Sequence, residues 1–409
     1  MSQILLQNAR VFDGTSGECP EGLQVLVEGD MIREVSDRPI KAPGAHVIDV
    51  AGRTLMPGMI DAHVHACASD VDPARVEQHG EVYRTAFAAR MLGHALDCGF
   101  TTVRDVGGAG YALGRAIADG LIRGPRFFYV GRFLSMTGGH GDFRPPHEGD
   151  GCSCGSMNSL GRIADGVDQV IRAAREELRR GAHCIKIMAS GGVASPTDPI
   201  WMNQYREDEI RAVVQETLER RTYTAAHCHP ASSIRRCVQL GVRSIEHGTL
   251  IDDETAQFVA DSQSYVVPTM AIIFGLMELG RALGFPAASQ QKVQVAYESA
   301  LSGMDSMRRA AVKVGFGTDL LGKLYTQQCR ELTIRSEVFS PLEILRQATS
   351  VTADLMQMRG RLGCIAPEAC ADLLVVDGDP LQDIGLLAAD GRNLPLIMRA
   401  GELVKNELP

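Results

Sequence analysis

The sequence predicts an α/β fold, in which a (β/α)8 (TIM) barrel carries a small β-sandwich-like domain formed by both termini. Three observations lead to this prediction. Short apolar segments alternate with longer amphipathic ones from residue 57 to about 360, which is typical of a parallel sheet with helical crossovers. Segments with strand-like alternation precede and follow this region. The length of 409 residues accommodates one barrel with a small appendage.

The two ends of the chain share one sequence pattern. Residues 1–56 contain the strand-like segments ILLQNARVFDG, LQVLVEGDMIREVSD and HVIDVAGRTLMPG, and the last fifty residues contain ADLLVVDGDP and PLIMRAGELVKN. Alternating apolar residues with Gly and Asp between them favour a half-buried antiparallel sheet. We therefore expect residues 1–56 and 361–409 to form one composite β domain, with a catalytic barrel of residues 57–360 inserted between them.

Eight short apolar segments in the middle region are the expected barrel strands. Amphipathic stretches such as RIADGVDQVIRAAREELRRG lie between them and predict the helices. The helical boundaries in residues 270–313 are not defined by the pattern. The predicted strands are MIDAHVHA, TTVRDV, RFFYVGR, HCIKIMAS, YTAAHC, RSIEHG, SYVVPTM and KVGFGTD.

Two connections are unusually long. SMTGGHGDFRPPHEGDGCSCGS follows the third strand and SGGVASPTDPIWMNQYRED follows the fourth. Barrel enzymes build their active sites at the carboxyl ends of the strands, and long loops in compact domains are usually functional or disordered. We interpret both as substrate-covering loops. Trp201, the only tryptophan, either lines an apolar pocket or anchors its loop.

Composition excludes several classes of protein. The formal net charge is -9 and no Lys/Arg-rich run occurs, which argues against nucleic-acid binding. No segment resembles a signal peptide, and no apolar run approaches the ~18 residues that span a membrane. Most of the eleven cysteines lie in apolar runs, as expected of buried thiols in a reducing, cytoplasmic environment. The pair Cys152 and Cys154 is open to two interpretations: the cysteines stabilise the loop, or they bind a metal ion.

Two predicted strands carry metal-binding or reactive side chains at their carboxyl ends. His63 and His65 lie two residues apart, so both imidazoles face the same side and can chelate one ion, although this spacing also arises by chance. Lys186 lies between Ile185 and Ile187 and would point into the barrel interior. It either extends its amine to the strand end, pairs with a carboxylate, or reacts with CO2 to form a carbamate that bridges two metals.

Four further residues follow later strands. His227 ends the fifth strand and His229 lies two residues further on, His247 ends the sixth, and Asp319 ends the eighth. Each alone has an ordinary structural explanation, such as a satisfied core histidine or a helix-capping aspartate. Packing requires no such set of polar residues at one end of several barrel strands, because Val, Ile and Leu fill those positions best. Together they indicate a metal centre.

The ordered set His-x-His, Lys, His, His, Asp resembles the amidohydrolase superfamily in its two-metal subtype. PGMIDAHVH, IEHG, GTD and ADLLVVD are similar to its characteristic segments. TGGHGD, SGGVASPTD and NQYREDEI resemble the imidazolonepropionase-like group, which contains prolidase-like dipeptidases, Xaa-Arg and Xaa-Pro carboxypeptidases and ochratoxin-type amidases.

The resemblance implies two divalent metal ions per chain. Zn²⁺ fits the nitrogen and oxygen ligands best, and such a pair brings the pKa of a shared water near neutrality. Asp319 would also act as the base that passes a proton to the departing nitrogen. The implied ligands are His63, His65 and Asp319 for the buried metal, His227 and His247 for the outer one, and N6-carboxylysine at Lys186 as the bridge.

The resemblance also implies substrate contacts. His229 would hydrogen-bond the developing oxyanion. Relatives often carry HAY or HAH where this chain has His227-Cys228-His229, so the substrate group that this position contacts stays open. His140 and Tyr205 lie in the two long loops and are candidates for substrate binding. Arg206 would pair with a substrate carboxylate, or it is a surface charge at the start of a helix.

Three functions remain open. The favoured one is a dipeptidase- or carboxypeptidase-like amidase that releases an amino acid from a dipeptide or N-acyl amino acid. The second is hydrolysis of a cyclic amide, such as imidazolonepropionate, or of a lactone. The third is a non-catalytic scaffold, against which all six filled ligand positions argue. The expected partners are a small-molecule substrate and further copies of the chain, since relatives are often oligomers, including octamers.

Overall fold

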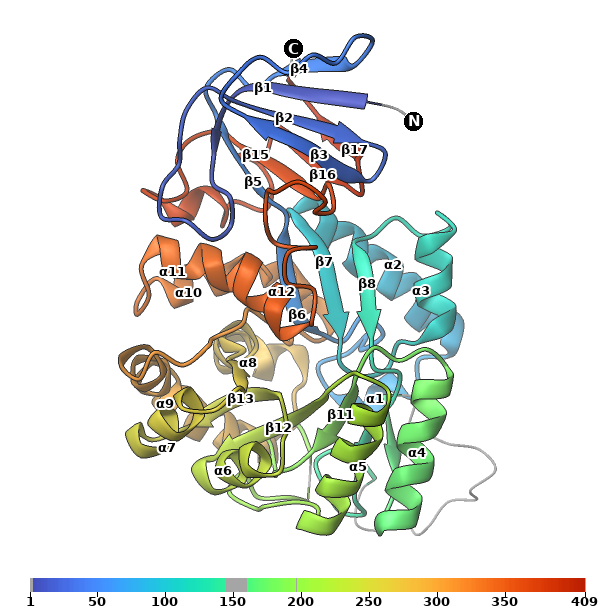
Figure 1. Cartoon of the computed structure of the whole chain (residues 1–409). Coiled ribbons are helices and arrows are strands. Elements are labelled where there is room, and N and C mark those ends of the chain that lie inside the picture. The colour runs from blue at the N-terminus through green and yellow to red at the C-terminus, as the bar shows by residue number, and fades with distance from the viewer. Residues whose placement is uncertain (1–2, 145–159, 196, 409) are drawn as a thin grey trace.

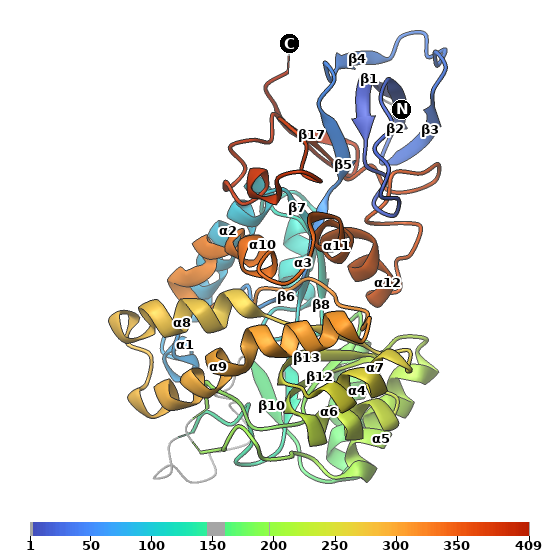
Figure 2. The ribbon, with the colours of Figure 1, turned by 90° about the vertical axis from the view of Figure 1, so that its left-hand side faces the viewer.

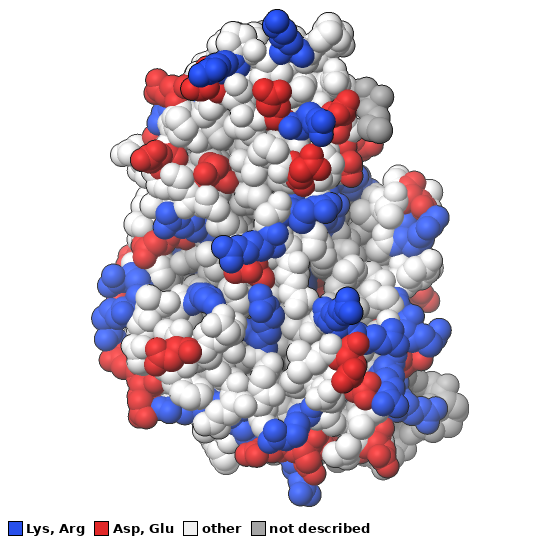
Figure 3. All heavy atoms as spheres, in the orientation of Figure 1, with Lys and Arg blue, Asp and Glu red and all other residues white. Residues whose placement is uncertain are grey.

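The computed structural model describes residues 3–144, 160–195 and 197–408. Figures 1 and 2 show strands from both ends of the chain gathered at one end of the molecule, with helices and parallel strands making up the rest. No helix within the described residues is long and apolar enough to cross a membrane. Acidic and basic side chains are interspersed over the face shown in Figure 3.

Both termini contribute to one mixed sheet with its own apolar core. The strand order is β17-β16-β15-β5-β1-β2-β3, with β4 beside β1. The alternation predicted an antiparallel sheet, yet β4 and β5 run parallel to β1, because alternation reports which face is buried and carries no information on strand direction. The strands are β1 (Gln3–Val11), β2 (Leu23–Glu28), β3 (Met31–Ser36), β4 (His46–Asp49), β5 (Thr54–Pro57), β15 (Leu373–Val376), β16 (Leu396–Arg399) and β17 (Glu402–Asn406). The division into residues 1–56 with 361–409 and residues 57–360 stays a prediction.

The middle of the chain forms two parallel sheets. One has three strands in the order β6-β7-β8, and the other has six in the order β10-β9-β11-β12-β13-β14. Every predicted strand of this region forms except the last, and β9 and β10 were not predicted. The strands are β6 (Met59–Val64), β7 (Phe100–Asp105), β8 (Arg126–Tyr129), β9 (Phe133–Ser135), β10 (Gly161–Ile163), β11 (Ile185–Met188), β12 (Thr224–Pro230), β13 (Ser244–Leu250) and β14 (Tyr265–Val267).

The predicted last strand, KVGFGTD, follows the edge of both sheets without forming a regular ladder. Val314 makes an isolated parallel bridge with Val266, and Phe316 accepts a hydrogen bond from the backbone of Ala62 at 2.8 Å. The strand pairing of the described residues therefore does not by itself close a ring. The segment nevertheless brings Asp319 beside β6.

Helices cover the outer faces of the parallel sheets (Figures 1 and 2). In α4, Val170, Ala173, Ala174 and Leu178 are buried at the spacing of one helical face. The helices are α1 (Pro73–Val76), α2 (Glu81–Asp97), α3 (Tyr111–Ala118), α4 (Val167–Arg179), α5 (Glu207–Glu219), α6 (Ala231–Gln239), α7 (Asp253–Ala260), α8 (Met270–Leu283), α9 (Ala287–Arg309), α10 (Arg330–Arg335), α11 (Pro341–Arg346) and α12 (Thr352–Leu355), with shorter turns η1 (Gly322–Gln327), η2 (Gln347–Val351) and η3 (Ile384–Leu386).

The segment that the sequence left undefined, 270–313, contains two helices. Gly284 ends α8 with φ +82°, a left-handed conformation that glycine adopts without steric cost, and Pro286 precedes α9. The two helices pack against each other. Both contribute to the pocket described next.

Candidate active site

The six predicted ligand residues line one pocket, at the carboxyl ends of the parallel strands. They come from β6 and the residue directly after it, from β11, β12 and β13, and from the turn after Phe316. His140 and His229 line the same pocket. This convergence is a consequence of parallel strands, whose carboxyl ends lie on one side of a sheet. The six are His63, His65, Lys186, His227, His247 and Asp319.

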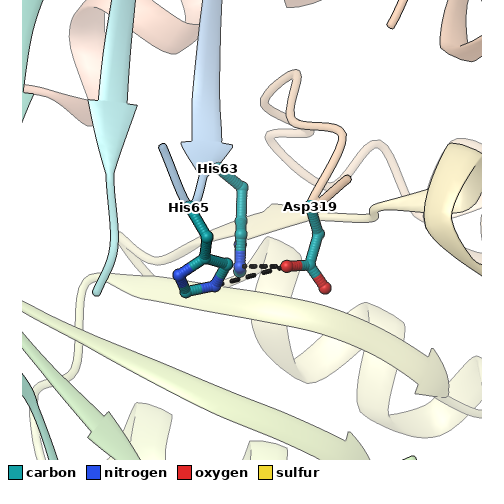
Figure 4. Close-up of side chains that lie close together, drawn as sticks. All are labelled: His63, His65 and Asp319. Carbon is teal, nitrogen blue, oxygen red and sulfur yellow. Dashed lines mark ion pairs between the residues drawn. The ribbon is translucent and has the colours of Figure 1, made fainter. Parts of the chain in front are cut away.

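His63, His65 and Asp319 form the tightest group. Their nearest donor atoms all lie within 4.8 Å of one another, and both imidazoles point toward the same carboxylate oxygen (Figure 4). The Nε2 atoms lie 3.4 Å (His63) and 3.3 Å (His65) from Asp319 Oδ1. Two nitrogens and one oxygen in this arrangement suit a divalent transition metal.

Buried acceptors orient the two imidazoles. Nδ1 of His63 donates to Glu246 at 2.7 Å, and Nδ1 of His65 donates to the carbonyl of Gly107 at 2.8 Å. The carboxylate of Asp105 in turn accepts the backbone N–H of Gly107 at 3.0 Å. Because Nδ1 carries the proton in each ring, Nε2 presents a lone pair toward Asp319. This is the tautomer that a metal-binding histidine requires.

Arg104 and Glu246 were missed by the sequence analysis. Both side chains are fully buried, and Arg104 Nη2 donates to Glu246 Oε1 at 2.8 Å. Burial by itself raises the pKa of Glu246, but Arg104 and His63 outweigh it and hold the pKa below its usual range. A charged residue inside each of the apolar strands TTVRDV and RSIEHG was the available signal, because such a residue requires a buried partner.

Lys186 is buried on β11 and faces the pocket. Its amine has no hydrogen bond or ion pair within the described part of the chain. Burial lowers its pKa, and the negative charges of Glu246 and Asp319 only partly offset this. A buried, unpartnered lysine is costly as an ammonium. The neutral amine is the form that reacts with CO2, so the environment fits a carbamate.

His227 and His247 form the second candidate set. Their ring centroids lie 4.6 Å apart. His247 Nδ1 is 2.7 Å from Thr269 Oγ1 and His227 Nε2 is 3.2 Å from the carbonyl of Gly191. Burial and the neighbouring histidines lower both pKa values well below the ordinary value. The lowered pKa values favour the neutral imidazoles that metal ligation requires.

The backbone is strained at two of the candidate ligands. His247 has φ +72° and Asp319 has φ +56°, a region that side-chain-bearing residues seldom occupy. Such strain costs ~1–3 kcal/mol per residue and persists where the surrounding structure enforces it, often at functional sites. The backbone N–H of Asp319 donates to the His63 carbonyl at 2.7 Å, which fixes this turn against β6.

His229 and His140 complete the histidine cluster. Burial, reinforced by the neighbouring His140, lowers the pKa of His229 to about 3, and its Nδ1 lies 2.9 Å from Thr249 Oγ1. The His140 ring stacks on His227 with centroids 4.1 Å apart. A Cβ on Gly192 would lie 2.3 Å from the His140 ring, so only glycine permits this close approach.

A lysine on α9 holds the loop that supports His140. Ser195 Oγ lies 2.8 Å from His140 Nδ1, and the Lys292 amine donates to the carbonyls of Gly192 at 3.1 Å, Ser195 at 2.8 Å and Asp198 at 2.6 Å. Three carbonyls from one loop thus share one cation. This role of Lys292 was not predictable from the sequence, because its acceptors are backbone atoms about a hundred residues away.

Replacing Lys292 by methionine is expected to raise KM about tenfold and to change kcat little. A hydrogen bond to a charged group contributes about 1.5–3 kcal/mol, and its loss lets the loop move before substrate orders it again. Steady-state kinetics would measure both parameters, with the exposed Lys41→Met as control. An unchanged KM would show that the loop does not need this clamp.

The structure does not bring every predicted substrate contact to the pocket. Tyr205 is buried away from the pocket lining, and its hydroxyl has no hydrogen-bond partner among the described residues. Arg206 is 84% exposed and lies 3.5 Å from Asp208 at the start of α5, where the side chain points outward. Trp201 is 70% exposed, so it does not line the pocket. Cys152 and Cys154 lie outside the described residues.

Apolar side chains form the remaining wall of the pocket. Part of this wall comes from α8 and α9, the helices that the sequence analysis could not delimit. Such a wall favours an apolar substituent on the substrate. Its members include Phe133, Phe143, Leu160, Val193, Ile272, Ile273, Leu276, Val293 and Leu321.

Comparison with known families places these features in context. The sequence profile of the amidohydrolase family matches residues 54–404, which is most of the chain and includes all six candidate ligands. The chain belongs to the amidohydrolase family. It therefore has the amidohydrolase fold and the character of a hydrolase, in a family that generally binds metal ions.

Individual amidohydrolases support the narrower resemblance. The crystal structure of a prolidase complexed with N-methylphosphonate-L-proline is 44% identical, covers 99% of this chain and 100% of its own, and superposes with a TM-score of 0.96. A Xaa-Pro dipeptidase with bound methionine is 27% identical over 99% of this chain and 100% of its own, with a TM-score of 0.89. Ochratoxinase from Aspergillus niger is 29% identical over 86% of this chain and 75% of its own length. The predicted resemblance to prolidase-like and ochratoxin-type enzymes is confirmed.

Proposed function

We propose that this amidohydrolase is a binuclear metal-dependent enzyme that cleaves the amide bond of a dipeptide or N-acyl amino acid. The observation that carries the proposal is one pocket in which four ligand-type histidines, a buried lysine and an aspartate face an apolar wall. Packing alone does not require this combination of residues.

The donor atoms are consistent with two divalent ions, and Zn²⁺ suits them best. His63, His65 and Asp319 would hold one ion, His227 and His247 the other, and a carbamate on Lys186 would supply the bridge. When bound, the pair of ions lowers the pKa of water to near neutrality. The absence of a partner for the Lys186 amine among the described residues supports the bridge.

The protein's own side chains then handle the proton and the carbonyl oxygen. Asp319 is suited to accept the proton of the attacking water and to return it to the leaving nitrogen. Its pKa lies well below the usual range, because the neighbouring histidines outweigh the effect of burial. His229 donates from Nε2 to the developing oxyanion when Nδ1 accepts from the Thr249 hydroxyl.

A closed eight-stranded barrel is part of this proposal. Backbone hydrogen bonds connect the two parallel sheets on both sides. On one side His183 N donates to Tyr129 O at 2.9 Å, and on the other the segment 313–319 bonds to both sheets, with Gly315 N donating to Val266 O at 2.8 Å and Ala62 N donating to Phe316 O at 2.8 Å. A closed barrel would hold ligands from opposite strands at fixed separations. We also propose that the enzyme is a cytoplasmic homo-oligomer without nucleic-acid or membrane partners, in line with the sequence prediction.

The relatives point to a substrate with an amino acid on the departing side of the bond. A prolidase binds a phosphonate derivative of proline, and a Xaa-Pro dipeptidase and an ochratoxinase are further relatives. The decisive experiment is to screen the zinc-loaded protein against dipeptide and N-acyl amino acid libraries and to score the freed amino acid. Absence of any release, with hydrolysis of a cyclic amide or lactone instead, would reject the proposal.

We expect the enzyme to require a free α-carboxylate next to the scissile amide. His140 lines the pocket and is the candidate for this carboxylate, since His229 is assigned to the oxyanion and Arg206 faces solvent. A charge-assisted contact of about 1.5–3 kcal/mol corresponds to a ten- to a hundredfold preference in kcat/KM.

The test compares one N-acyl amino acid with its C-terminal amide and its methyl ester. The free acid should have the higher kcat/KM by the stated factor, and His140→Ala should reduce the difference. Equal values for the acid and the amide would remove the carboxylate requirement. They would also favour the cyclic-amide and lactone alternatives.

A further inference from the structure

A second cluster of metal-ligating side chains lies outside the catalytic pocket. The sulfurs of Cys98 and Cys329 and a carboxylate oxygen of Asp390 all lie within 4.8 Å of one another. His94 adds a nitrogen, since its Nε2 is 3.5 Å from Cys98 Sγ. None of these residues lines the catalytic pocket.

The four residues come from three separate segments. His94 lies in the last turn of α2 and Cys98 directly follows that helix, Cys329 directly precedes α10, and Asp390 follows η3 near the C-terminal end of the chain. Both sulfurs are buried, whereas Asp390 is exposed. The cluster is thus closed toward the core and reachable from solvent on one side.

The backbone positions Asp390 against the two sulfurs. Asp390 has φ +50°, an unfavourable conformation for a residue with a side chain. A Cβ on the neighbouring Gly391 would lie only 2.0 Å from the carbonyl oxygen of Asp97, so this turn is packed directly against the end of α2.

The charges of the cluster favour a bound cation. The neighbouring Cys329 and His94 lower the pKa of the Cys98 thiol to about 6, although burial and the Asp390 carboxylate act in the opposite direction. Arg392 Nη1 lies 4.0 Å from Asp390 Oδ2, and His94 is hydrogen-bonded to Cys98 within the cluster. A divalent ion between the sulfurs and the carboxylate would satisfy all these donors together.

We propose that Cys98, Cys329, Asp390 and His94 form a structural site for a thiophilic divalent cation, with Zn²⁺ as the best match. Zinc binds thiolate sulfur at ~2.3 Å and nitrogen or oxygen at ~2.0–2.2 Å in tetrahedral sites. The donor atoms of Cys98, Cys329 and Asp390 already lie within 4.8 Å of one another, and His94 would approach from its position beside Cys98. Binding releases the two thiol protons to solvent. The ion ties the C-terminal segment around Asp390 to α2 and α10.

Cobalt substitution distinguishes this site from the catalytic one. The proposed catalytic ligands are nitrogen and oxygen only, so a thiolate-to-Co²⁺ charge-transfer band in the near ultraviolet reports the new site alone. We expect the Co²⁺-loaded enzyme to show this band, and Cys98→Ser/Cys329→Ser to lose the band and one metal ion per chain while retaining hydrolytic activity. Lys186→Ala should keep the band, which separates this proposal from the proposed catalytic centre.

The matched control is Cys237→Ser. Cys237 is also buried and its sulfur lies 3.6 Å from that of Cys228, but the pair belongs to no group of three ligand-type side chains among the described residues. This variant should keep the band and the metal. If the double variant does not fold, the single variants His94→Gln and Asp390→Asn still retain both thiols. In each of them the Co²⁺ affinity, measured by titration of the thiolate band, should fall by at least about tenfold.

Three results would overturn the proposal. The first is the absence of a thiolate band in the Co²⁺-loaded, reduced wild-type protein. The second is an unchanged band in the double variant, or unchanged affinity in both single variants. The third is a mass spectrum of the protein purified without reductant that shows a Cys98–Cys329 disulfide in place of a metal ion.

Discussion

Replacing Lys186 by alanine is expected to remove the metal ions and the hydrolytic activity together. The side chain is buried, faces His63, His227 and Asp319 across the pocket, and has no partner of its own among the described residues. Without a bridging carboxylate, two cations held a few ångströms apart repel each other. Loss of residues that merely support a metal ligand costs ten- to a hundredfold, so loss of the bridge itself should lower activity by more than about a hundredfold.

Lys186→Met separates the bridge from simple packing. Methionine fills most of the space of lysine but forms no carbamate, so it should lose metal and activity as fully as alanine does. Added acetate or propionate should partly restore the alanine variant, because the vacated space admits a carboxylate, but not the methionine variant. Metal analysis and kinetics on both proteins measure this. Two bound metals and full activity in Lys186→Ala would rule out the bridge.

Asp319→Asn is expected to lower kcat by about 10²–10⁴-fold, the usual contribution of a general base. The amide retains an oxygen near His63 and His65, whose nitrogens lie 3.4 and 3.3 Å from Asp319 Oδ1, but it cannot accept and return a proton. KM should change less than kcat, because the lost interaction acts in the transition state.

Metal content decides how that loss is interpreted. A variant that keeps both ions and loses turnover supports the proton-transfer role, whereas a variant that loses metal supports ligation alone. Asp252→Asn, which changes a carboxylate that caps α7, is the control and should leave kcat unchanged. Near-normal turnover by Asp319→Asn of verified mass would reject the base assignment.

Much of the site was predictable from residue spacing. His63 and His65 converge on one carboxylate because residues two apart in a strand share a face. Lys186, His227 and His247 converge because parallel strands end on one side of the sheet. These are properties of regular strands, so the sequence pattern was sufficient to bring the six residues together.

Loops and single backbone turns were not predictable in the same way. Tyr205 and Arg206 in the long loop after β11 were candidates for substrate contacts, with a surface charge at the start of a helix as the alternative for Arg206. Tyr205 is buried elsewhere, and Arg206 is 84% exposed, as the alternative predicted. Their positions follow from the left-handed turn at Tyr205, with φ +56°, and from the start of α5. No periodicity encodes such a turn, because it is enforced by contacts with distant segments.

The sequence by itself determined the alternation of strands and helices and the candidate ligands at the strand ends. It also indicated, from their shared strand-like pattern, that the two chain ends form one domain. Only the tertiary structure showed that Arg104 neutralises Glu246 behind His63, that Lys292 holds the loop beside His140, and that Cys98 and Cys329 meet Asp390. The physical reason is the range of the interactions. Periodicity reports burial within one element, whereas these contacts join residues up to about three hundred positions apart and exist only once the elements are packed.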